Sequence, residues 1–231
     1  LVLGTSDVNG TYTVTAGGHI TDDGALDIEG IATISATTSY NVTLDNTSND
    51  FTNDVRVIGD DVQLVDANGI VLGTSNVDGT YAVTATAGGD ITDEGTLDIE
   101  GAATFTAANG QSIYLNDTSN DFNTTVTFAA VSGSLANVTI DDDSAIALPA
   151  LNITGNLFVT AGGAVTDNGV LDIDGETTIL ASGSNVTLDN GSHDFSNDVK
   201  ITGNTVVLVD TNALVLGTSD VNGTYTVTAG G

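Results

Sequence analysis

Three consecutive aspartates, at residues 141–143, are the side chains of this chain best suited to binding a metal ion. Carboxylate oxygens are the hard ligands that Ca²⁺ prefers, and six to eight oxygens must converge on one ion. The run also interrupts a pattern that is repeated elsewhere in the chain. We therefore expect Asp141, Asp142 and Asp143 to form a calcium site, and no other cofactor is predicted.

Other acidic residues lie in Gly-containing turns, such as Asp22 in TDDG, Asp93 in TDEG and Asp167 in TDNG. Neither the EF-hand loop nor the calcium-binding nonapeptide repeat is present. Asp and Asn also tolerate the backbone geometry of turns and cap them. Two interpretations are open, calcium binding and turn formation, and we favour turn formation.

Acid–base catalysis has few candidate residues in this sequence. The basic residues are Arg56 and Lys200, and the histidines are His19 and His193. In other copies of the repeat described below, these positions hold Thr, Asp, Ala or Asn. No Ser-His-Asp grouping and no phosphate-binding Gly loop is visible. We predict no catalytic or cofactor-binding residue and a protein that is not an enzyme.

The charge balance excludes two classes of partner. The chain has 31 acidic and two basic residues, a net charge of −29 over 231 residues, so it would repel the phosphates of nucleic acids and anionic lipids. No apolar run approaches the roughly 20 residues of a membrane span. We therefore expect no nucleic-acid partner and no membrane insertion in this segment. Because the chain lacks Met even at position 1, we expect it to be part of a longer protein.

The chain is built from internal repeats. Residues 1–18 recur unchanged at 214–231, and related copies lie at 70–89 and 146–163. The Gly-Gly pairs that end these copies begin at residues 17, 88, 162 and 230. This spacing predicts one solenoid segment over residues 1–231, with repeat units at about 17–87, 88–161 and 162–229.

Short β-rich runs alternate with Gly, Asn and Asp throughout each unit. Nine such runs in a repeat of about 71 residues predict three coils of three strands, roughly ten coils in all, in an all-β parallel β-helix, a β-solenoid. In LDIE, the aliphatic Leu26 and Ile28 should point inward and Asp27 and Glu29 outward, because side chains alternate along a strand. The equivalent acids at 97–100 and 171–174 are expected to extend one acidic face.

Four motifs, GTYTVTAGG, ITDxGxLDIxG, VTLDNxSNDF and VxLVDxNxxVLGTS, cover the chain. Together they resemble the β-helical repeats of filamentous-haemagglutinin-like giant adhesins and exoproteins of bacteria. The resemblance implies a right-handed β-helix, secretion and a location on the cell surface. It leads us to expect a non-catalytic structural shaft of a secreted cell-surface fibre or giant adhesin.

The alternative is a carbohydrate- or protein-binding adhesive module of the same surface protein. A shaft should be equivalent from coil to coil, whereas a receptor site should break the repeat. The clearest break lies between Ala129 and Ala150, where VSGSLA lengthens a turn and Pro149 replaces the Gly of other copies. The expected partners are neighbouring copies or repeats of the chain itself, end to end, with surface glycans or proteins of a host or partner cell as further candidates.

Overall fold

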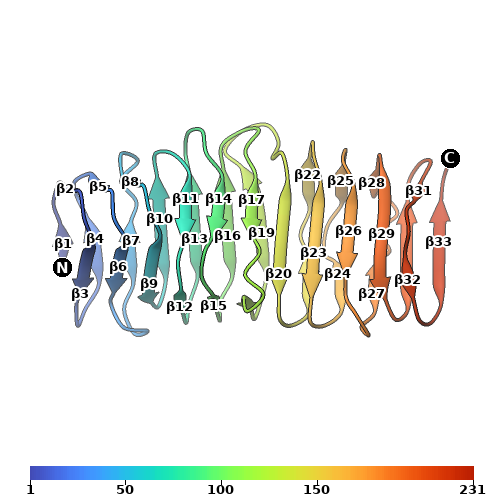
Figure 1. Cartoon of the computed structure of the whole chain (residues 1–231), viewed down its shortest axis with the longest axis horizontal. Coiled ribbons are helices and arrows are strands. Elements are labelled where there is room, and N and C mark those ends of the chain that lie inside the picture. The colour runs from blue at the N-terminus through green and yellow to red at the C-terminus, as the bar shows by residue number, and fades with distance from the viewer.

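The computed structural model describes residues 1–231 and contains 33 β-strands and no helix. The strands lie side by side along the long axis of the molecule, with the N- and C-termini at opposite ends (Figure 1). All strand pairs are parallel, and about eleven turns stack to form the rod. The predicted all-β parallel solenoid is confirmed.

The strands form two faces with the core between them. Face A holds β1 (Val2–Leu3), β4 (Ile20–Asp22), β7 (Val42–Leu44), β10 (Val62–Asp66), β13 (Tyr81–Ala85), β16 (Ala103–Ala107), β19 (Val126–Ala130), β21 (Ile146–Leu148), β24 (Val165–Asp167), β27 (Val186–Leu188), β30 (Val206–Asp210) and β33 (Tyr225–Ala229). It also holds the shorter β2 (Ser6–Val8), β5 (Leu26–Ile28), β8 (Asp50–Phe51), β22 (Leu151–Ile153), β25 (Leu171–Ile173) and β28 (Asp194–Phe195).

Face B is one continuous 15-stranded sheet. It contains β3 (Tyr12–Thr15), β6 (Ala32–Ser35), β9 (Val55–Gly59), β11 (Ile70–Leu72), β12 (Ser75–Val77), β14 (Ile91–Asp93), β15 (Leu97–Ile99), β17 (Ile113–Leu115), β18 (Asp121–Phe122), β20 (Val138–Asp142), β23 (Leu157–Ala161), β26 (Thr177–Leu180), β29 (Asp198–Gly203), β31 (Val215–Leu216) and β32 (Asp220–Val221).

Each repeat makes three and a half turns. Strand β9 pairs with both β11 and β12, so two short consecutive strands occupy one face where other passes use a single strand. The first repeat therefore crosses the molecule in seven passes: β1–β2, β3, β4–β5, β6, β7–β8, β9 and β10. Because seven is odd, β11, the equivalent of β1, begins on the opposite face. Each repeat therefore consists of seven passes that alternate between the two faces, and not of the three coils of three strands that we expected.

The core is lined by the aliphatic and aromatic residues that alternation predicted. Leu26, Ile28 and Tyr81 are fully buried, and Phe51 is 1% exposed. In the second repeat, Phe105 lies at the centre of an aromatic cluster, with ring centroids 5.9 Å from Tyr81, 6.1 Å from Phe122 and 6.2 Å from Phe128. One continuous cluster of 54 buried residues runs through the rod.

The predicted single acidic face is wrong. The acids of the LDI strands do lie outside the core, but Asp27 follows face A in β5 while its equivalent Asp98 follows face B in β15. Asp172, in β25, returns to face A. The half-turn left over in each repeat causes this alternation, so negative charge is distributed over both faces.

The regular stacking is interrupted at the boundary between the second and third repeats. Val138 lies 12 positions after Val126, whereas Val62 lies seven positions after the equivalent Val55. No ladder joins β19 to β21, and only an isolated bridge, from Leu135 in the turn after β19 to Ile153 in β22, crosses this gap in face A. The break that the sequence indicated between residues 129 and 150 is therefore a break in the sheet of face A, while face B continues.

Candidate functional site

The carboxylates of Asp121, Asp142 and Asp143 converge next to this boundary. One ligand oxygen of each lies within 4.8 Å of the others. Asp142 ends β20 and is 1% exposed, and Asp143 follows it on the surface. Asp141 lies outside the cluster because consecutive side chains of a strand point in opposite directions. Two of the three expected ligands are thus brought together, and Asp121 takes the place of the third.

Asp121 is not among the predicted ligands, although it lies in a recognisable motif of the repeat. It precedes the inward Phe122 in a motif that reads SNDF in the first two repeats and SHDF in the third. Strand β18 lies one turn below the end of β20, and the Asp143 N–H donates to the Asn120 carbonyl at 2.8 Å. Only this stacking brings two aspartates that are 21 positions apart in the chain to one place.

The same site in the other two repeats has an amide donor that binds the equivalent of Asp121. Asn68 Nδ2 donates to Asp50 Oδ2 at 3.1 Å, and Asn212 Nδ2 donates to Asp194 Oδ1 at 3.0 Å. The second repeat has Ser144 at this position. Asp121, the equivalent of Asp50 and Asp194, therefore has no amide donor opposite it.

Burial raises the pKa values of the two inner carboxyls of this cluster. For Asp142, the charge of Asp121 raises the pKa in addition to burial, although hydrogen bonds from Ser144 lower it in part. For Asp121 the charges of Asp143 and Asp98 act in the same direction as burial. The cluster is therefore a site of uncompensated negative charge.

The turn aspartates have a structural role that differs from both interpretations, because they bind the next turn of the solenoid and do not cap their own turns. Each accepts a backbone N–H from the next turn through its Oδ1 atom, at 2.8–3.1 Å. The pairs are Asp22 with Asp45, Asp93 with Asn116, and Asp167 with Asp189. These carboxylates thus hold successive turns together.

His193 is also part of the stacking. Its Nδ1 accepts the Leu171 N–H at 3.0 Å, and its Nε2 lies 3.5 Å from Asp167 Oδ2. Asn120, its equivalent, accepts the Leu97 N–H at 2.8 Å and donates to Asp93 Oδ2 at 2.7 Å. Burial lowers the pKa of His193, against the opposing effect of Asp167.

Both basic residues are paired with acids. Arg56 Nε lies 2.6 Å from Asp54 Oδ2, and Lys200 Nζ contacts Glu176 Oε2. The glycine one turn above each of them is necessary, because a Cβ at Gly73 would lie 2.6 Å from the Arg56 side chain and one at Gly217 would lie 2.6 Å from that of Lys200. These two glycines therefore accommodate long side chains on face B.

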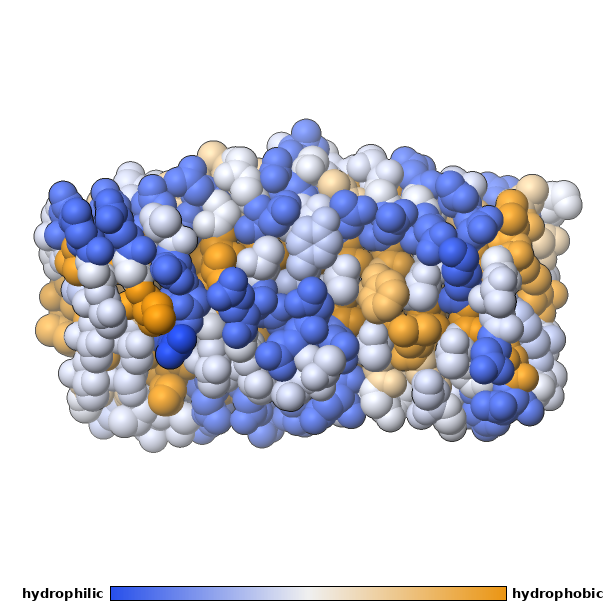
Figure 2. Space-filling model, in the orientation of Figure 1, coloured by the Kyte–Doolittle hydropathy of each residue, from blue (hydrophilic) through white to orange (hydrophobic).

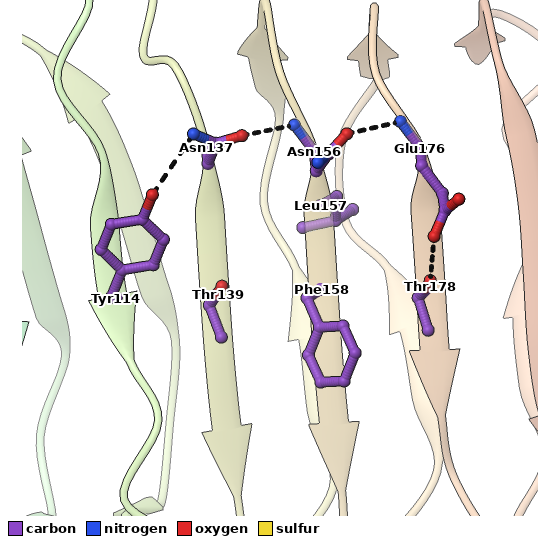
Figure 3. A pocket seen from close by; sticks show the side chains of 8 residues that line it. All are labelled: Tyr114, Asn137, Thr139, Asn156, Leu157, Phe158, Glu176 and Thr178. Carbon is purple, nitrogen blue, oxygen red and sulfur yellow. Dashed lines mark hydrogen bonds between the residues drawn. The ribbon is translucent and has the colours of Figure 1, made fainter.

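A shallow groove of about 350 Å³ lies on face B and spans the same boundary, from β17 to β26. Tyr114, Thr139, Phe158 and Thr178 form one cross-strand ladder along its floor (Figure 3). Phe158 is 38% exposed. Equivalent outward positions in the other repeats hold Thr or Ala, so both aromatic side chains depart from the repeat.

Polar groups line the upper edge of the groove in a continuous chain (Figure 3). Asn137 Nδ2 donates to the Tyr114 hydroxyl at 3.3 Å, and Asn137 Oδ1 accepts the Asn156 N–H at 2.8 Å. Asn156 Oδ1 in turn accepts the Glu176 N–H at 2.8 Å. The groove therefore combines two aromatic rings with amide and carboxylate groups held in defined orientations.

The family model for repeats of unknown function (DUF5649) matches the chain at residues 1–58, 59–129, 135–202 and 203–231. The chain belongs to this family of repeats. The matches omit residues 130–134, which comprise the last residue of β19 and the first part of the lengthened turn between β19 and β20. No curated protein and no solved structure matches the chain. None of its elements is a helix long and apolar enough to cross a membrane.

Proposed function

We propose that this segment is a non-catalytic structural shaft of a secreted cell-surface fibre or giant adhesin. The observation that carries the proposal is the unbroken 15-stranded sheet of face B, with one core of 54 buried residues beneath it. Each turn contacts only its neighbours, so a solenoid is lengthened by duplication without redesign of its core. Eleven turns spaced by about 4.8 Å give a rod roughly 50 Å long.

Two further features support this role. The sequence motifs resemble those of secreted bacterial adhesins, and the net charge of −29 would keep neighbouring rods hydrated and apart. The polar side chains that could have served catalysis are used in stacking: His193 and the turn aspartates bind backbone N–H groups, and Arg56 and Lys200 are paired with acids.

Labelling of intact producer cells tests the surface location. Antibodies raised against the 231-residue segment should decorate unpermeabilised cells, and mild protease treatment of those cells should remove the label. An antibody against a cytoplasmic enzyme of the same cells is the control. Labelling that appears only after permeabilisation would contradict the proposal.

The groove on face B supports a second candidate function, carbohydrate binding. Tyr114 and Phe158 are two strands apart on one ladder, a separation of roughly 10 Å, and face outward beside fixed amide groups. Aromatic faces pack against the apolar faces of sugar rings, while amides and carboxylates bind hydroxyls. This is also the part of face B that departs from the repeat, as a receptor site should.

A glycan screen followed by calorimetry tests this function. Tyr114→Ala and Phe158→Ala should each abolish binding of any neutral oligosaccharide that the wild-type segment binds. Tyr40→Ala is the matched control, because Tyr40 is similarly exposed, at 37%, but lies outside the groove. Binding that survives both groove substitutions would exclude the groove as the sugar site.

A further inference from the structure

We propose that Asp121, Asp142 and Asp143 bind one Ca²⁺ ion at the end of β20. The inference does not depend on the function of the segment, because it rests on the difference between this cluster and its two counterparts in the same chain. These counterparts are built on the same fold and serve as internal controls.

The first difference is the loss of an amide donor at one position and the gain of a carboxylate at the position before it. In the first and third repeats, an Asn amide binds the carboxylate of Asp50 or Asp194. In the second repeat the amide is replaced by Ser144, and the preceding residue, Ala67 or Thr211 elsewhere, becomes Asp143. Two substitutions thus remove the amide donor and add a third carboxylate.

The second difference concerns a buried oxygen. Asp66 Oδ2 accepts the Phe51 N–H at 2.7 Å, and Asp210 Oδ1 accepts the Phe195 N–H at 3.0 Å. In Asp142, 1% exposed, Oδ1 accepts the Ser144 N–H and hydroxyl. The Phe122 N–H lies near this carboxyl but does not reach hydrogen-bond geometry, so Oδ2 is buried without a well-formed hydrogen bond.

The neighbouring carboxylate has the same defect. Asp121 Oδ1 is also buried without a hydrogen-bond partner. Burying an unpaired charged oxygen is costly, so a positive partner would stabilise the ionised form of both carboxylates. The two basic side chains of the protein cannot supply it, since Arg56 and Lys200 are paired with Asp54 and Glu176.

The geometry suits Ca²⁺. Ligand oxygens bind Ca²⁺ at about 2.3–2.6 Å, so two oxygens on one ion lie at most about 5 Å apart. The three ligand oxygens are all within 4.8 Å of one another. Asp143 is exposed, which leaves an open side where water completes the coordination. Mg²⁺ demands nearly ideal octahedral geometry at about 2.0–2.1 Å, and a cluster of three carboxylates on a β-solenoid edge fits the more adaptable Ca²⁺ better.

Two double variants provide the test. Asp143→Ala with Ser144→Asn converts the cluster to the arrangement of the first repeat, which the fold already accommodates. Ala67→Asp with Asn68→Ser builds the cluster in the first repeat. Each protein is stripped with EDTA and titrated with CaCl₂, and separately with MgCl₂, by calorimetry in about 0.15 M NaCl, which screens diffuse attraction to the acidic rod.

The wild type should bind one Ca²⁺ ion, the first double variant should bind at least tenfold more weakly, and the second should bind two ions. Thermal unfolding with and without Ca²⁺ gives a second measurement: Ca²⁺ should raise the midpoint of the wild type but not that of the first variant. Equal stoichiometry and affinity in the wild type and the first variant would overturn the proposal and show diffuse counter-ion binding only. Tighter binding of Mg²⁺ than of Ca²⁺ would overturn the assignment of the ion.

Discussion

A buried acceptor at one position of each repeat binds the first N–H of the LDI strand that lies one turn earlier in the chain. Asn49 Oδ1 accepts the Leu26 N–H at 3.0 Å, and Asn120 and His193 do the same for Leu97 and Leu171. All three acceptor side chains are fully buried. His193 therefore supplies the same buried hydrogen-bond acceptor that Asn supplies in the other two repeats.

Replacement of His193 tests this interpretation. His193→Asn should change the free energy of unfolding by less than about 1 kcal/mol, because Asn accepts the equivalent N–H in the other repeats. His193→Ala should destabilise by about 1–3 kcal/mol, because the Leu171 N–H would be buried without a partner. Urea unfolding followed by circular dichroism measures both. Equal losses of stability in the two variants would mean that the His193 ring contributes by packing and not by accepting the Leu171 N–H.

Asp66 also accepts backbone N–H groups from a buried position, but burial disfavours the charged form of its carboxyl. It is fully buried and accepts the N–H groups of Phe51 and Asn68, both at 2.7 Å. Burial raises its pKa from 3.8 to about 6 despite these hydrogen bonds. The native state therefore binds a proton at Asp66 that the unfolded chain releases between about pH 4 and pH 6.

This raised pKa predicts a pH dependence of stability. The contribution of Asp66 is fully present below the unfolded pKa and is lost as the pH rises through about 6, a change of about 3 kcal/mol. The stability of the wild type relative to Asp66→Asn should therefore increase as the pH falls from about 7.5 to about 4.5. The lowered pKa of His193 acts in the opposite direction but cancels in this comparison. A constant difference between the two proteins across this range would contradict the prediction.

At the scale of the strand and turn, the close stacking of corners explains several glycines. A Cβ at Gly101 would collide with the carbonyl oxygen of Gly79 one turn below, and a Cβ at Gly175 would collide with the backbone of Gly155. The backbones approach so closely because the chain turns sharply between its two faces at these points. Gly191, in a turn that projects from the rod, has no heavy atom within 4 Å of the same position.

Alanine substitutions at two glycines should therefore differ in effect. Gly101→Ala should lower the free energy of unfolding by about 1–3 kcal/mol, because the added methyl forces two turns apart. Gly191→Ala should lie within about 0.5 kcal/mol of the wild type, as an exposed substitution. Thermal unfolding of the two variants compares them directly. A similar loss in both would indicate that glycine is needed for backbone freedom rather than for space.

At the scale of the whole molecule, the half-turn in each repeat determines how charge and apolar surface are presented. Acids appear on both faces. Apolar side chains are exposed at the two ends of the rod and at a few positions along its sides (Figure 2). Leu1 and Val2 are 59% and 60% exposed at one end, and Val215 and Leu216 are 53% and 47% exposed at the other. In an isolated segment, each end combines exposed apolar side chains with an unpaired strand edge, which favours self-association through the ends.

The isolated 231-residue segment should associate end to end. Its mass measured by light scattering should rise with concentration, while X-ray scattering should show a longer particle of unchanged cross-section. Val215→Lys with Leu216→Lys should restore the monomer by adding charge to one apolar end. A monomer at all concentrations, or a particle that thickens instead of lengthening, would contradict this prediction.

The sequence by itself determined the fold class and the identity of the core. Strict alternation placed Leu26 and Ile28 inside and Asp27 outside, since the side-chain period of a strand is local and does not depend on which strand lies next to it. Repetition of the pattern then required successive units to stack. The lengthened turn between residues 129 and 150 was also visible as a break in the repeat.

Only the tertiary structure decided how many passes a repeat makes and which residues meet. Whether two short runs such as β11 and β12 lie along one face or on either side of a corner depends on β9 beneath them, which no local pattern reveals. This choice places Asp27 and Asp98 on opposite faces. For the same reason the partner of Asp142 is Asp121, one turn below, and not the adjacent Asp141: contacts between turns are set by stacking register, while neighbours along a strand point apart.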